Sequence, residues 1–182
     1  MSELVDKLYE AEVKKADHDH HVPTAGAMTG HILANLKLES LKLFQSASYV
    51  KGENYVTLHH LFLDLAKKED ALFYDLSKEL LIEGELVPTT NEEITRYGKI
   101  EEAGKNKYHS AEVMLETFVK DFDWQNLFIG RAIKLAEKEE KFSLQHALIE
   151  LLAFNKENIL TFQALNGHDA RYGLDDEDED ED

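Results

Sequence analysis

Two glutamates interrupt the apolar stripes of two long predicted helices. Glu39 lies on the apolar face of the helix expected over residues 29–50, and Glu69 lies on that of the helix expected over residues 55–83. A carboxylate that faces an apolar interior is costly unless it is paired or binds a cation. The two positions therefore predict a metal site inside the protein.

Two amides lie at corresponding places in the later helices. Gln125 is near the middle of the third long predicted helix, and Asn155 is near the middle of the fourth. If all four polar side chains project inward, a polar layer crosses the helices at one height. The alternative is that each glutamate turns outward or pairs with a lysine, for which Lys42 or Lys156 is available.

A second set of metal-binding side chains lies in a predicted loop near the N-terminus, over residues 17–26. Five consecutive residues there carry carboxylate or imidazole groups: Asp17, His18, Asp19, His20 and His21. Such oxygen and nitrogen donors bind divalent cations, and the chain has no cysteine that could supply a thiolate. The alternative is a solvated hinge, in which Pro23 and Gly26 keep the segment out of a helix.

The elements that must position these groups are predicted to be helical. The 182 residues suffice for one domain with a sizeable core, and two prolines with nine glycines leave room for long helices. Helices are expected over residues 2–16, 29–50, 55–83, 110–139 and 142–165, with a short helix at the capping box in residues 89–93. Four long amphipathic helices with a long connection between the second and third predict an all-α, up-down-down-up four-helix bundle.

Three segments carry a family resemblance. Residues 49–59 read Tyr-Val-Lys-Gly-Glu-Asn-Tyr-Val-Thr-Leu-His, residues 31–36 read His-Ile-Leu-Ala-Asn-Leu, and residues 162–167 read Phe-Gln-Ala-Leu-Asn-Gly. In order and spacing they resemble the Dps (DNA-protection-during-starvation) branch of the ferritin superfamily. The resemblance implies a ferritin-like bundle with a short helix in the long connection and an extra N-terminal helix. It also implies a hollow homododecameric shell that binds DNA and sequesters iron as Fe²⁺ and Fe³⁺.

The residues that carry iron chemistry in the Dps family are mostly replaced. Of two histidines expected twelve residues apart, only His59 is present, and Ala47 stands at the first position. Leu63 stands where the family has an aspartate, and Tyr74 and Lys78 stand where it has a further aspartate and a glutamate. The resemblance therefore implies a degenerate family ferroxidase centre, and metal is not expected at its usual position between subunits.

Three functions stay open on this basis. The leading hypothesis is a Dps-like shell that binds and protects DNA and sequesters iron. The second is a ferritin-like iron-oxidising enzyme whose site has moved inside the subunit, to Glu39 and Glu69. Weak ferroxidase activity is thus left open, although the Glu-x-x-His pair of ferritins is absent because Leu72 follows Glu69 by three residues. The third is an architectural nucleoid protein without metal chemistry.

DNA binding through the N-terminal helix is implied mainly by the resemblance. Lys7, Lys14 and Lys15 project from similar sides of that helix, but its acidic residues make its net charge slightly negative. Many copies on one shell would supply many weak phosphate contacts. The helix is also expected to pack on a neighbouring subunit through its apolar side chains.

Acidic residues recur at two further places. Glu137, Glu139 and Glu140 fall at the junction of the last two helices, where shells of this kind open pores, and they either attract Fe²⁺ or form a solvated face. The terminal run Asp175–Asp182 carries eight of the net −17 charges and is predicted to be disordered. This tail is either solubilising or a competitor with DNA that also attracts cations.

The expected organisation has three parts: an N-terminal helical arm and loop (1–27), the ferritin-like bundle (28–168) and an acidic disordered tail (169–182). No apolar run approaches the length of a membrane span, and the N-terminus lacks the apolar region of a signal peptide. The expected location is therefore cytoplasmic and nucleoid-associated, without a membrane partner.

Overall fold

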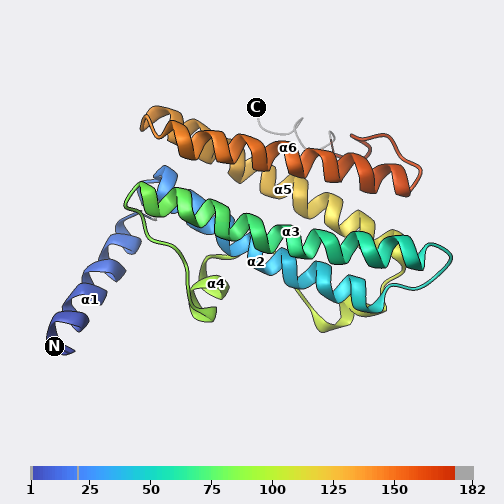
Figure 1. The fold of residues 1–182 in the computed structure, drawn as a ribbon, viewed down its shortest axis with the longest axis horizontal. Coiled ribbons are helices and arrows are strands. Elements are labelled where there is room, and N and C mark those ends of the chain that lie inside the picture. The colour runs from blue at the N-terminus through green and yellow to red at the C-terminus, as the bar shows by residue number, and fades with distance from the viewer. Residues whose placement is uncertain (1, 20, 175–182) are drawn as a thin grey trace.

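The structure is a computed structural model that describes residues 2–19 and 21–174 (Figure 1). Its helices are α1 (Ser2–Asp19), α2 (Ala25–Tyr49), α3 (Tyr55–Ile82), α4 (Asn91–Tyr97), the short 3-10 helix η1 (Gly104–Tyr108), α5 (Ala111–Lys138) and α6 (Phe142–Leu165). The predicted all-α fold is confirmed. Within the described ranges, no helix combines the length and the apolar character that a membrane crossing requires.

The four long helices form two antiparallel hairpins that pack on each other (Figure 1). Helices α2 and α3 make one hairpin and α5 and α6 make the other, with α2 against α5 and α3 against α6. The connection from α3 to α5 runs along the bundle and places α4 and η1 against α2. This is the predicted up-down-down-up order with a short helix in the long connection.

The helix ends follow from local sequence. The Thr90 side chain accepts a hydrogen bond from the Glu93 backbone and the Glu93 side chain accepts one from the Thr90 backbone, which confirms the predicted capping box of α4. The Ser110 side chain caps α5 by accepting a hydrogen bond from the Val113 amide. Gly84 follows α3 with a φ of 72°, a conformation that glycine adopts without a steric penalty.

The N-terminal region differs from the prediction at two points. Helix α1 continues to Asp19, so the loop expected from residue 17 begins later. Helix α2 begins at Ala25 and not at residue 29, because the Thr24 side chain caps it by accepting from the Ala27 amide at 3.1 Å. Gly26 is therefore inside the helix, where a Cβ atom would lie 2.5 Å from the Glu85 side chain.

The segment after α6 folds back on the bundle. Gln163 donates to the carbonyl of Tyr172 at 2.8 Å, and Arg171 pairs with Asp123 of α5 at 3.1 Å. Leu174 packs on the apolar core. These contacts hold the segment up to Leu174 against the bundle, past residue 168, where the bundle was predicted to end. The acidic run 175–182 lies outside the described residues.

The bundle core consists of two apolar clusters. One surrounds Phe62, Phe118 and Phe162, and the other surrounds Ile32, Leu36, Phe73, Ile129 and Leu148. On every long helix a polar residue lies between the segments that enter the two clusters: Glu39, Glu69, Gln125 and Asn155. The predicted polar layer is thus present, and it divides the core at mid-height.

Candidate metal centre

Glu39 and Glu69 are both completely removed from solvent in the middle of the bundle. Each has an exposed fraction of 0%. None of their four carboxylate oxygens has a hydrogen-bond partner among the described residues. Native proteins rarely leave buried polar groups unpaired, and such a group is costly when nothing binds it.

The two amides of the layer are in the same condition. Gln125 and Asn155 are buried at 2% and 1% exposure. The Gln125 Nε2 atom and both polar atoms of the Asn155 side chain lack partners within the described part of the chain. Two helical hairpins therefore bring two carboxyl groups and two amides, all with unused donors or acceptors, to one height of the bundle.

The nearby lysine does not neutralise the glutamates by direct contact. Lys42, three residues after Glu39, is bonded to Asp121 of α5. Lys156, the other lysine considered as a partner, is exposed on α6. The alternative in which each glutamate pairs with a lysine is therefore wrong, and so is the alternative in which the glutamates turn outward.

Burial controls the protonation of these acids. It raises the pKa of Glu69 to about 8. It also raises the pKa of Glu39 well above its ordinary value, and the negative charges of Asp121 and Glu69 act in the same direction while Lys42 opposes them. Burial likewise raises the pKa of Asp121, against the charge and hydrogen bond of Lys42. The site thus holds protons that a cation could replace.

The donor set suits a hard or borderline divalent cation. Carboxylate and amide oxygens are the ligands that such cations accept, and no thiolate is present. Across residues 2–19 and 21–174, however, no three His, Asp or Glu side chains already converge on a common point. The two buried glutamates are therefore a partial ligand set in this conformation.

The position of the Dps family's iron centre has a different character. The Nδ1 atom of His59 donates to the Ala47 carbonyl at 2.8 Å, and its ring stacks on Tyr55. Ala47 is buried, whereas Tyr74 and Lys78 are exposed. The ammonium of Lys37 lies 4.6 Å from the centre of the Tyr74 ring and pairs with Asp70 at 2.6 Å.

The histidine cluster near the N-terminus is only partly within the described residues. His18 is near the end of α1, and His21 follows it with its Nδ1 atom donating to the Asp17 carbonyl at 2.9 Å. Asp19 ends the helix, and His20 lies outside the described residues. Because Asp17 to Asp19 are helical, the cluster is not the continuous loop that the sequence suggested.

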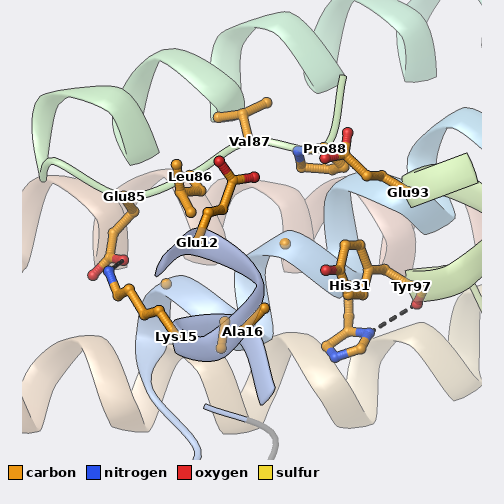
Figure 2. A pocket seen from close by; sticks show the side chains of 13 residues that line it. Glu12, Lys15, Ala16, His31, Glu85, Leu86, Val87, Pro88, Glu93 and Tyr97 are labelled. Atoms are coloured by element: carbon orange, nitrogen blue, oxygen red, sulfur yellow. Dashed lines mark hydrogen bonds and ion pairs between the residues drawn. The ribbon is translucent and has the colours of Figure 1, made fainter. Parts of the chain in front are cut away.

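Helix α1 extends away from the bundle near the start of α2 (Figure 1). Lys7 pairs with Glu3 at 2.7 Å, and Lys14 is exposed. Figure 2 shows Lys15 reaching from α1 to Glu85, with its Nζ atom 3.4 Å from the carboxylate, beside a cavity of about 100 Å³. The three candidate DNA contacts are thus in three different environments.

The three predicted pore residues also lie in different environments. Glu137 and Glu140 are exposed. Glu139 accepts the backbone amide of Ala25 at 2.8 Å and pairs with Lys141 at 2.9 Å. Lys141 in turn pairs with Glu85 at 2.8 Å. We call Lys15, Glu85, Lys141 and Glu139 the ionic junction, because they join α1, the end of α3, the start of α2 and the α5–α6 turn.

Comparison with known proteins agrees with this architecture. The family of ferritin-like domains matches residues 30–171. DpsA of Lactococcus lactis is 48% identical, with a TM-score of 0.87 over 92% of this chain and 99% of DpsA. The chain belongs to the Dps branch of the ferritin superfamily. DpsB of the same species is 42% identical, with a TM-score of 0.89 over 93% of this chain and 98% of DpsB.

A more distant Dps relative supports the same assignment. The DNA protection during starvation protein of Listeria innocua is 26% identical over 137 residues, which are 75% of this chain and 88% of that protein. Within this Dps protein, the polar layer is the feature that sequence reasoning found only in part. Asp121 was missed, although it precedes Gln125 by four residues and therefore lies on the same helix face.

Proposed function

We propose that this Dps-like protein forms a homododecameric shell that binds and protects DNA and takes up iron at Glu39 and Glu69 inside each subunit. The observation that carries the iron part is the burial of both carboxyl groups without a partner among the described residues. Replacing such groups by apolar ones is often neutral or stabilising. Their presence in an otherwise apolar core is therefore best explained by a cation that uses them.

Iron is the cargo or the substrate in this proposal. Fe²⁺ would be bound by carboxylate oxygens of Glu39 and Glu69, with the amide oxygens of Gln125 and Asn155 as further donors. Two carboxylates and no histidine in the layer are fewer ligands than ferritin-like di-iron centres use. We therefore expect sequestration with slow oxidation, and a dedicated iron-oxidising enzyme is the second candidate.

The DNA part of the proposal uses the arm formed by α1. The arm projects from the bundle (Figure 1), so it can reach a partner outside the subunit. Lys7 and Lys14 are accessible for phosphate contacts, and the exposed Leu4 and Leu8 give the arm an apolar face for packing on a neighbouring subunit. A cytoplasmic, nucleoid-associated location belongs to this proposal because the DNA is there.

Calorimetric titration of the assembled protein with Fe²⁺ under argon tests the iron site. We expect saturable binding in the wild type, and roughly 10- to 100-fold weaker binding in both Glu39→Gln and Glu69→Gln. The matched control is Glu116→Gln, which removes the same charge from an exposed position of α5. Anomalous-scattering maps of Fe²⁺-soaked crystals would locate the ion directly.

Three results would argue against the proposal. If both glutamine variants bind like the wild type, the ion is held elsewhere. Ordered iron beside His59 at a subunit interface would show that the family site is still in use. If the wild type binds DNA but no Fe²⁺ at all, the protein is an architectural nucleoid component.

A further inference from the structure

Lys42 lies between the buried carboxyl groups and the surface. Its side chain is only 6% exposed, yet it forms part of the wall of a groove of about 560 Å³ beside α2. Leu41, Phe44 and Glu102 also line this groove. The Lys42 ammonium is bonded to Asp121 of α5. Lys42 is thus a groove-wall residue that shares a helix face with Glu39 and contacts Asp121 of α5.

Asp121 is a further carboxylate beside the layer, because it precedes Gln125 by four residues and shares its helix face. Its side chain is 18% exposed. Lys42 follows Glu39 by three residues and shares its helix face, and Asp121 is bonded to Lys42, so the pair lies beside Glu39. Glu101, before η1, acts in turn on Asp121. The Lys42–Asp121 pair therefore lies next to the layer, and Lys42 is in the wall of the groove.

We infer that Lys42 is a gate: its ammonium occupies Asp121 until a divalent cation displaces it, and Asp121 then becomes the third carboxylate ligand beside Glu39 and Glu69. The inference rests on the proposed intrasubunit site. It explains why two buried glutamates are present while no three acidic or histidine side chains converge within the described residues. In the closed conformation the missing ligand is engaged by the lysine.

The exchange is favourable on electrostatic grounds. A single positive charge on Lys42 faces Asp121, whereas a divalent cation that displaces the protons of Glu39 and Glu69 into solvent would interact with three carboxylates at short range. Lysine is suited to release because its charge is carried by a flexible four-carbon side chain. The Nζ atom also lies 5.9 Å from the centre of the Phe118 ring, a weak contact that displacement would break. Glu102, an exposed carboxylate that also lines the groove, is an acceptor for the displaced ammonium.

Two substitutions in the full-length assembled protein should change metal binding in opposite directions. In Lys42→Met the shape of the side chain is largely kept but the competing charge is gone, so Mn²⁺ should bind more tightly and enter faster, each by roughly tenfold. In Asp121→Asn the third carboxylate is lost, so Mn²⁺ should bind roughly 10- to 100-fold more weakly. Isothermal calorimetry gives the affinity, and stopped-flow quenching of Trp124, the single tryptophan and the neighbour of Gln125, gives the uptake rate.

The opposite signs separate a gate from a purely structural ion pair. If Lys42 and Asp121 serve only stability, both variants lower the melting temperature and neither changes the affinity or the uptake rate, which would overturn the gate. The gate would also be overturned if Lys42→Met took up Mn²⁺ no faster than the wild type, as expected if a neighbouring subunit covers the groove. Lys42→Gln serves as a second variant if Lys42→Met does not assemble, because glutamine can still donate to Asp121 without a charge.

Failure of the gate and failure of the site are distinguishable. If wild-type binding is abolished by Glu39→Gln but Lys42→Met and Asp121→Asn behave like the wild type, the site stands and the gate falls. If Glu39→Gln has no effect, both fall. Weakening of Mn²⁺ binding by Asp121→Asn also in the Lys42→Met background would support Asp121 as a ligand in its own right.

Discussion

The polar layer and the ionic junction each contain two glutamates, and these are in opposite states. In the junction, Glu85 has Lys141 at 2.8 Å and Lys15 at 3.4 Å. Partial burial alone would raise the pKa of Glu85, but the hydrogen bond and charge of Lys141, with those of Lys15, lower it overall. In the layer, burial raises the pKa of Glu69 to about 8, and no partner among the described residues offsets it.

The carboxylates of the junction stabilise the fold through ion pairs, whereas the fold keeps the carboxylates of the layer buried at a cost in stability. The junction fixes helix ends: Glu139 accepts the first amide of α2, and Lys141 ties Glu139 to Glu85. The layer does the reverse, because the surrounding apolar clusters keep Glu39 and Glu69 in a place where their ionised forms are unfavourable. A ligand is the natural complement of such a layer.

Stability at alkaline pH should show the largest contrast. The folded protein keeps a proton on Glu69 up to a pH of about 8, whereas the unfolded chain loses it near 4.5. Between these values the unfolded state binds fewer protons, so the free energy of unfolding falls as the pH rises. Glu69→Gln removes this dependence, and we expect it to stabilise the metal-free protein at pH 8 by on the order of 4 kcal/mol.

Urea unfolding of chelator-treated protein at pH 5 and pH 8 measures this effect. The variant and the wild type should be nearly equal at pH 5 and diverge at pH 8. Glu116→Gln again serves as the control, since its carboxylate is exposed. Equal stability of Glu69→Gln and the wild type at pH 8 would mean that Glu69 is already ionised and compensated, so that the layer would not differ from the junction.

Metal addition should stabilise the layer and leave the junction unaffected. A ligand that binds only the folded state at about 100 times its dissociation constant stabilises it by about 2.7 kcal/mol. We therefore expect Fe²⁺ under argon to raise the melting temperature of the wild type and of Glu85→Gln equally. The Glu39→Gln/Glu69→Gln double variant should show no such rise. An equal rise in the double variant would place the bound ion outside the layer.

The paired carboxylates should behave in the opposite way to the layer. Glu85→Gln leaves Lys141 and Lys15 with one fewer charged partner, and we expect a loss of about 1 kcal/mol at neutral pH. Because the pKa of Glu85 is lowered in the folded state, its contribution is present above the unfolded value near 4.5 and is lost as the pH falls through the folded value. Urea unfolding from pH 7 to pH 3 should show the gap between variant and wild type closing. A constant gap would mean that Glu85 acts through packing alone.

The sequence was sufficient for the parts of the molecule that depend on periodicity. The interruption of apolar stripes at Glu39 and Glu69 predicted burial, because a helix fixes which residues share a face. The sequence could not show that Lys42 pairs with Asp121, since that contact depends on the packing of α2 against α5. The ionic junction was missed for the same reason: its members come from three separate parts of the chain.

The smallest expected effect concerns the arm, where the junction and DNA compete for one lysine. Each phosphate contact that is lost should weaken DNA binding. It should also reduce the slope of log K against log salt concentration by about 1 per lysine. Lys14→Ala removes an exposed charge and should show this loss in a gel-shift series over salt. Lys15→Ala should show less, because Glu85 already neutralises Lys15 in the free protein.

The substitution Glu85→Gln tests whether Glu85 and DNA compete for Lys15, or whether Lys15 is simply too far from the phosphates. If Glu85 holds Lys15 away from DNA, then Glu85→Gln should release it and strengthen DNA binding slightly, with a steeper dependence on salt. In the Lys15→Ala background the same Glu85→Gln change should have no effect on DNA. If Glu85→Gln leaves DNA binding unchanged in both backgrounds, Lys15 does not reach phosphate even when free, and the arm binds DNA through Lys7 and Lys14.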